Sequence, residues 1–161
     1  MYVSVPSVDD EAWRTLEPGV APPVQRLRAV RELIDAGINA GVLMAPIVPG
    51  FTSSRSKVEA TIKAIADHGA RFVGCAVMHL EDGTRDHFFR FLEQSFPSML
   101  PGLTRLYAKK HAPAAYRKEV EAMVRVLQDR YGVRSRGEGS STSATPADEP
   151  ATLPRQVGFA W

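Results

Sequence analysis

The sequence predicts an α/β fold: part of a TIM-type (β/α) barrel with about three parallel βα units, followed by C-terminal helices. Short apolar runs typical of strands alternate with stretches of helical periodicity, in the order strand, helix, strand, helix, strand, helix. The connections are short, as expected for parallel strands joined by helical crossovers. A closed barrel needs about 250 residues, so we expect either a fragment of a larger barrel, which we favour, or a chain that pairs with another.

Composition and charge describe an ordinary soluble protein. The chain has 161 residues, enough for one sizeable core, and a formal net charge of +2, which predicts no strong field toward nucleic acids or membranes. Its single cysteine, Cys75, excludes a disulfide framework within the chain. No apolar stretch approaches the roughly 20 residues needed to span a bilayer, and no secretory signal is visible. We therefore expect a cytoplasmic protein and no membrane partner.

The first βα unit begins at once. Residues 1–6 have the pattern of a strand, and Ser7 is placed to cap a short helix whose first turn is acidic and which ends before Pro18. A second helix opens at Pro22-Pro23, where proline is tolerated, and ends at Gly37.

The next apolar run, residues 40–48, predicts a strand buried on both faces. Pro46 has no N–H to donate, so regular pairing should stop near it, and the chain should turn through Pro49-Gly50. Loops that follow parallel strands are where ligands bind in such folds. This strand and its loop are therefore a good place for a site.

The rest of the chain repeats the pattern and then changes. Ser56 and Glu59 have capping-box spacing for a helix that ends at Gly69. Residues 71–78 predict the third strand, and residues 79–83 predict the loop after it. A helix follows and ends at Pro97. A basic segment, 107–111, precedes a long helix that starts at Pro113 and is capped by Gly132. We expect residues 1–100 to form the partial barrel, 101–133 a C-terminal helical extension, and 134–161 a disordered polar tail.

Several segments, taken together in their order and spacing, resemble the second half of radical S-adenosylmethionine (SAM) enzymes of the spore-photoproduct-lyase-like, or DNA repair photolyase, branch. They are residues 4–9 (SVPSVD), 16–19 (LEPG), 22–27 (PPVQRL), 33–38 (LIDAGI), 45–50 (APIVPG), the helix that ends in Phe96-Pro97, 106–107 and 112–116. The resemblance covers roughly residues 2–131 and corresponds to barrel strands four to six with a C-terminal extension.

The resemblance implies a cofactor chemistry that this chain carries only in part. In the family, a CxxxCxxC loop holds a [4Fe-4S] cluster that reduces SAM, and the resulting radical takes a hydrogen atom from the substrate. That loop is absent here, and Cys75 alone cannot replace it. The chain would therefore hold part of the SAM pocket and none of the cluster.

The resemblance also indicates positions that would bind SAM. These positions are Ser4, Glu17, Arg26, Pro46, Pro49, Gly50 and His79. From the sequence we assign no catalytic residue and no metal ligand. Arg26 would grip the SAM carboxylate, with Glu17 as its partner or as an orienting group; a structural salt bridge is the alternative. A strand-end hydroxyl bound to local backbone is the alternative for Ser4. The family often has Asn-Asp after Gly50, so the polar role there passes to Thr52 or Ser53.

Three further groups of residues could be functional, but each also has a purely structural explanation. His79, Glu81, Asp82 and His87 have residue types that suit zinc or iron, but a polar surface loop is favoured. Cys75 is best explained as a small core residue. The basic residues between 105 and 118 interleave with Tyr107 and Tyr116, which suits nucleic acid, but a solvated face is favoured.

Two functions follow. The first is the C-terminal fragment of a radical SAM protein, in a branch that includes DNA-lesion lyases, which we expect to be inactive alone and to work with a cluster-bearing N-terminal chain. The alternative is a non-enzymatic βα module that completes a partner chain or binds nucleic acid through its basic C-terminal segment. We expect the exposed edge of the first strand to cause aggregation or obligate association.

Overall fold

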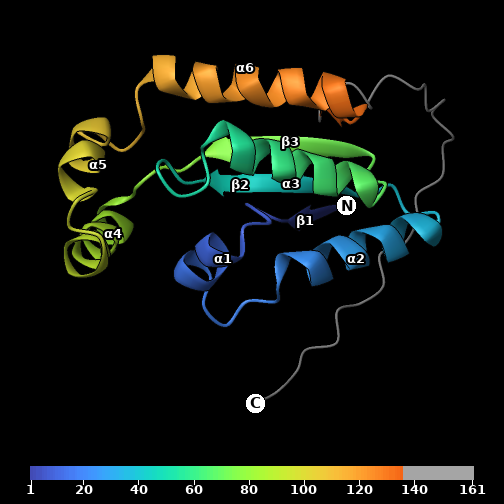
Figure 1. Cartoon of the computed structure of the whole chain (residues 1–161), viewed down its shortest axis with the longest axis horizontal. Helices are drawn as coiled ribbons and strands as arrows, with labels where there is room; N and C mark the ends of the chain where they lie inside the picture. Colours follow the sequence, from blue (N-terminus) through green and yellow to red (C-terminus); the bar gives the residue numbers. More distant parts are fainter. Residues whose placement is uncertain (136–161) are drawn as a thin grey trace, which may run out of the picture.

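A computed structural model describes residues 1–135 (Figure 1). The elements are β1 (Tyr2–Ser4), α1 (Asp10–Leu16), α2 (Pro23–Asp35), β2 (Gly41–Ile47), α3 (Arg55–Asp67), β3 (Phe72–Val77), α4 (Asp82–Ser95), α5 (Leu100–Leu106), α6 (Ala114–Tyr131) and β4 (Arg134–Ser135). Within these residues, no helix is both long and apolar enough to cross a membrane.

The four strands form one parallel sheet in the order β1-β2-β3-β4. This confirms the α/β class with parallel βα units; closure into a barrel is not seen in the described part of the chain. The pairing of β2 with β3 shifts register between Met44 and Ile47. Pro46 lies within that shift, as its missing N–H predicts.

The two faces of the sheet differ in what covers them. Alternate strand residues, among them Val42, Met44 and Val73, are buried in one apolar cluster with side chains from α2, α3 and α6. The residues between them point to the opposite face. Of these, Ser4 and Ala76 are exposed and Ala45 is only half-buried. The sheet is therefore packed against helices on one face and largely uncovered on the other.

A second apolar cluster lies beyond the carboxyl ends of the strands. It joins the loops after β2 and β3 to α4, α5 and the segment before α6. In Figure 1, α4 and α5 sit past the end toward which β2 points, and α1 lies at the same end. This end of the sheet is thus covered by α1, α4 and α5.

Two predicted helix starts are wrong. Ser7 does not cap α1, because its Oγ accepts the N–H of Asp9 at 3.1 Å in a tight local turn. Asp9 is the cap instead, and its Oδ1 accepts the Ala12 N–H at 2.7 Å, which holds the pKa of that carboxyl below its usual value. The capping box of Ser56 and Glu59 does not form either. Ser54 occupies the cap position of α3, and Glu59 binds Arg130 and Tyr131 of α6.

The chain beyond Pro97 also differs from expectation. Helix α5 was not predicted, and α4 begins at Asp82, inside the expected loop. Gly132 caps α6 in the left-handed conformation, as predicted. Arg134 and Ser135 belong to β4 and not to a tail, because Gln128 of α6 donates to the carbonyls of Val73 and Arg134 and holds the two strands together. The rest of the expected tail, 136–161, lies outside the described residues.

Candidate functional site at the carboxyl edge of the sheet

The carboxyl ends of β1, β2 and β3 meet at one edge, because the strands are parallel. The Ser4 hydroxyl, at the end of β1, donates to the Ala45 carbonyl of β2 at 3.1 Å. The Met78 N–H, just after β3, donates to the Ile47 carbonyl at 3.0 Å. The three strand ends at which the sequence predicted a binding site therefore lie side by side and are joined by hydrogen bonds. The Ser4 hydroxyl makes the local backbone contact that was the alternative to cofactor binding.

The loop after β2 is held by its own hydroxyl groups. The Val48 N–H donates to Thr52 Oγ1 at 2.8 Å, and the Gly50 N–H donates to Ser53 Oγ at 3.1 Å. Gly50 has a φ of +79°, and a Cβ there would lie 2.5 Å from Met99. The Pro49-Gly50 turn is thus fixed in shape. The two hydroxyls to which a polar role was assigned are used inside the loop.

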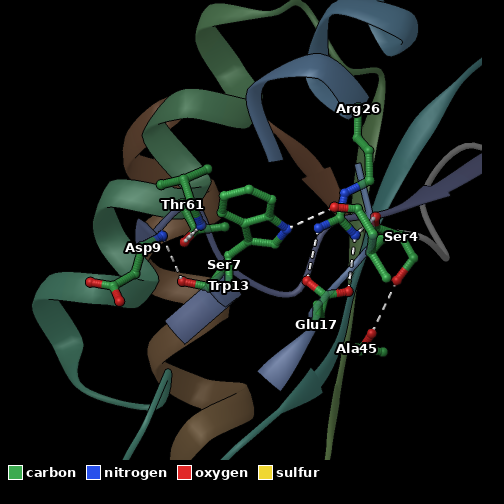
Figure 2. Close-up of polar contacts among 10 residues, drawn as sticks. Ser4, Ser7, Asp9, Trp13, Glu17, Arg26, Ala45 and Thr61 are labelled. Carbon is green, nitrogen blue, oxygen red and sulfur yellow. Dashed lines mark hydrogen bonds and ion pairs between the residues drawn. The ribbon is translucent and has the colours of Figure 1, made fainter. Parts of the chain in front are cut away.

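Arg26 and Glu17 form a bidentate ion pair beside the end of β1 (Figure 2). Nη1 of Arg26 lies 3.1 Å from Oε1 of Glu17, and Nη2 lies 2.8 Å from Oε2. Nη1 also donates to the Ser4 carbonyl at 3.0 Å. The pair therefore ties the first turn of α2 to the residue after α1 and to the last residue of β1.

This pairing decides what Arg26 offers a ligand. Both terminal nitrogens face Glu17, so the end-on fork of the guanidinium is occupied, and the salt bridge named as the alternative is present. The side chains keep only 12% and 24% of their surface exposed. Arg26 Nε is buried and has no hydrogen-bond partner in the described part of the chain. In this structure Arg26 holds the site together and does not reach into it.

A cavity of about 210 Å³ opens between α1, α4 and the ends of the strands. Its walls are mainly apolar and come from five segments of the chain. They are Pro6, Ser7, Ala12, Trp13, Leu16, Glu17, Pro46, Val48, Thr52, Met78 and Phe88. Pockets for drug-sized ligands usually measure about 300–1,000 Å³, so this cavity suits one ring system and not a whole nucleoside with its side chain. The Trp13 indole N–H donates to the Val20 carbonyl at 3.1 Å, which fixes one wall.

The loop after β3 is fastened to the segment that precedes α6. Tyr107 is fully buried, and its hydroxyl donates to the Met78 carbonyl at 2.8 Å. Burial raises the pKa of Tyr107 well above its usual value. Leu80 N–H donates to the Lys110 carbonyl at 2.8 Å, and His79 and His111 form an isolated antiparallel bridge. His79 is exposed at this edge, next to the cavity-lining Met78.

The possible metal ligands do not gather as a set. Glu81 pairs with Lys110, which lowers the pKa of that carboxyl, while Asp82 and His87 belong to α4. In residues 1–135, no three His, Cys, Asp or Glu side chains are grouped so that they could hold a metal ion. Cys75 is half-buried and packs against the main core, and burial raises the pKa of its thiol.

The basic segment is partly committed to internal contacts. Tyr107 is buried and so cannot stack on a base. Lys110 pairs with Glu81, and Arg117 Nε donates to the Ala112 carbonyl at 3.2 Å. The alternation of aromatic and basic residues in the sequence does not become an exposed stacking surface around Tyr107.

The sequence did not predict which residues line the cavity or that His79 and His111 lie side by side. Trp13 and Phe88 line the cavity from α1 and α4, which are distant in the sequence, and only tertiary packing brings them together. His111 meets His79 because the chain returns to the strand ends after α4 and α5. The only hint of this contact in the sequence was a histidine in each of the two segments that reach this edge.

Comparison with known proteins gives relatives of unknown function. The chain is 30% identical over 156 residues to uncharacterised proteins from two strains of Mycobacterium tuberculosis and from Mycobacterium bovis. The match covers 96% of this chain and 45% of each relative, so the chain spans less than half the length of these curated proteins. No family model and no solved structure matches the chain.

Proposed function

We propose that this chain is the C-terminal part of a radical SAM protein of the spore-photoproduct-lyase-like branch, and that it supplies one wall of the SAM pocket. The observation that carries the proposal is the edge described above. Three successive parallel βα units bring Ser4, Pro46 and His79 to one end of a sheet whose second face is largely uncovered. The greater length of the mycobacterial relatives is consistent with a further half that would complete such a protein.

The residues of this chain could contact SAM, but they could not hold a [4Fe-4S] cluster. A [4Fe-4S] cluster needs three or four thiolates, and the chain has one cysteine, so no step of cluster chemistry is assigned to it. The apolar cavity between α1 and α4 fits a planar ring such as adenine. A SAM carboxylate would compete with Glu17 for the two terminal nitrogens of Arg26.

The chain's own residues would bind and orient the cofactor. When bound beside a reduced cluster, SAM supplies the radical that removes a hydrogen atom from a substrate. Trp13, Val48 and Phe88 would exclude water from the ring that enters the cavity. The Arg26–Glu17 pair would keep α1, and with it Trp13, in place over the strand ends.

The first test is SAM binding to the full 161-residue chain. Nuclear magnetic resonance should show a saturable shift of the Trp13 indole N–H when SAM or S-adenosylhomocysteine is added. Ala12→Leu places a larger side chain in the cavity wall and should abolish the shift. Ala122→Leu, the same change on an exposed position of α6, should leave the shift intact. Shifts that are absent, or that are equal in both variants, would refute the proposed site.

A second test uses the portion of the Mycobacterium tuberculosis relative that this chain does not match. We expect that portion to co-purify with the chain and, after anaerobic reconstitution with iron and sulfide, to form 5′-deoxyadenosine from SAM when dithionite is added. Association without SAM-dependent shifts or product would favour the alternative, a non-enzymatic module that completes a partner. Salt-sensitive binding of DNA by the chain alone, without either result, would favour a nucleic-acid module.

A further inference from the structure

His79 and His111 stand directly opposite each other on the antiparallel bridge that joins the loop after β3 to the segment before α6. The bond from Leu80 N–H to the Lys110 carbonyl joins the residue after His79 to the residue before His111. This pattern makes the two histidines a non-hydrogen-bonded pair, the kind in which opposed side chains approach most closely and share one face.

The distance between the two rings suits a shared metal ion. Their centroids are 5.5 Å apart and their planes are inclined by 36°. A zinc–nitrogen bond is about 2.0–2.1 Å, which places each ring centre roughly 3 Å from the metal. At a tetrahedral angle the two centres would then lie about 5 Å apart. A small adjustment of the two side chains would thus bring one nitrogen of each ring onto the same ion.

Both rings are accessible and uncommitted. The two histidines are exposed, and in the described part of the chain their contact is with each other and not with a hydrogen-bond partner. Lys110, the residue before His111, is paired with Glu81. Imidazole is a ligand that Zn²⁺, Ni²⁺ and Cu²⁺ prefer, and two ring nitrogens leave the other positions for water.

We propose that His79 and His111 form a two-histidine site for a late first-row divalent metal ion such as Zn²⁺. The ion clips the loop after β3 to the segment that leads into α6. Helices α4 and α5 lie between these two points in the chain, so the clip closes the unit that roofs the cavity. The site shares His79 with the edge proposed to bind SAM, but metal binding by the two rings needs neither the cavity nor the cluster and is measured without SAM.

The test is thermal unfolding of the untagged full-length chain with increasing Zn²⁺, repeated with Ni²⁺. Above the dissociation constant, the melting temperature should rise by about 3–6 °C for each tenfold increase in free metal. Excess chelator should reverse the rise. His79→Ala and His111→Ala should each lose it, whereas His87→Ala, a change of another exposed histidine, on α4, should keep it.

Folding of the variants is checked by their melting temperatures without metal, which should match the wild type because both side chains are exposed. Broadening of the His79 and His111 ring signals by Ni²⁺ gives a second readout that does not depend on stability. A rise that survives in either single variant, a rise lost in all three, or no rise at all would overturn the proposal. SAM binding is measured separately, so a failure here leaves the proposed function untouched.

Discussion

Tyr107→Phe tests whether the Tyr107 hydroxyl fastens α5 and the segment before α6 to the carboxyl edge of the sheet. Tyr107 is fully buried, and its hydroxyl donates to the Met78 carbonyl at 2.8 Å. A typical hydrogen bond contributes about 0.5–1.5 kcal/mol net, and a buried acceptor left without its donor costs about 1–3 kcal/mol. The phenyl ring keeps the apolar packing, so we expect the free energy of unfolding to fall by about 1–2 kcal/mol at pH 7.

The same substitution predicts a pH dependence with a defined sign. Burial raises the pKa of Tyr107 in the folded protein, whereas an unfolded tyrosine titrates near pH 10. The stabilising contribution of the neutral phenol is therefore complete below about pH 10 and is lost as the pH rises above it. By pH 11 the unfolded state gains about 1.4 kcal/mol from ionisation. The stability difference between wild type and Tyr107→Phe should then shrink to near zero.

Urea denaturation at pH 7, 9 and 11 measures both effects. The midpoint should shift at pH 7 with an unchanged slope. Tyr116→Phe is the matched control, because Tyr116 is only half-buried, and its loss of a hydroxyl should change stability by less than about 0.5 kcal/mol. A Tyr107→Phe protein as stable as wild type at pH 7, or a difference that stays constant to pH 11, would refute the reasoning.

Substitutions at Asp9 and Gly41 test the local structure at the start of α1 and at the amino ends of β2 and β3. Asp9→Ala should lower the free energy of unfolding by about 1 kcal/mol at pH 7 because α1 loses its cap, while Asp9→Asn should keep most of it. The pKa of Asp9 is lowered in the folded state. The difference in free energy of unfolding between wild type and Asp9→Asn should therefore fade below about pH 4. A difference that persists at pH 2 would contradict this. Gly41→Ala should cost about 1–3 kcal/mol or more, because its Cβ would lie 2.2 Å from the Phe72 ring and 2.5 Å from the Phe72 carbonyl oxygen. Gly83→Ala, where nothing lies within 4 Å, should be neutral or slightly stabilising in thermal melts, and equal effects of the two glycine changes would argue against the close approach.

Periodicity was sufficient to predict the first three strands of the sheet and the helices that connect them, but not β4. The run at 40–48 and the helices before and after it follow patterns set by burial on one face, and the structure has them in these places. Helix α5 was missed because Pro101 and Gly102 have the character of a turn. Proline is tolerated in the first helical turn, where its missing N–H would have no partner in any case.

The site was less predictable than the fold because it depends on contacts distant in sequence. Its place at the strand ends follows from parallel topology alone. The topology does not tell which polar groups remain free to bind a ligand. Glu17 fills the fork of Arg26, and Thr52 satisfies the backbone of Val48. The cavity and the His79–His111 pair arise only when separate segments fold over the same edge.

The strands of this sheet lie side by side in the same order in which they occur in the chain. During synthesis on a ribosome, β2 leaves the exit tunnel when β1 is already available as its neighbour, and β3 then finds β2. Among the four strands in residues 1–135, none has to wait for a partner encoded later and inserted between two others. The wall can therefore be assembled one βα unit at a time from the amino terminus, and the roof of the site, built from α4, α5 and the segment before α6, is completed only after the three strand ends it covers are in place.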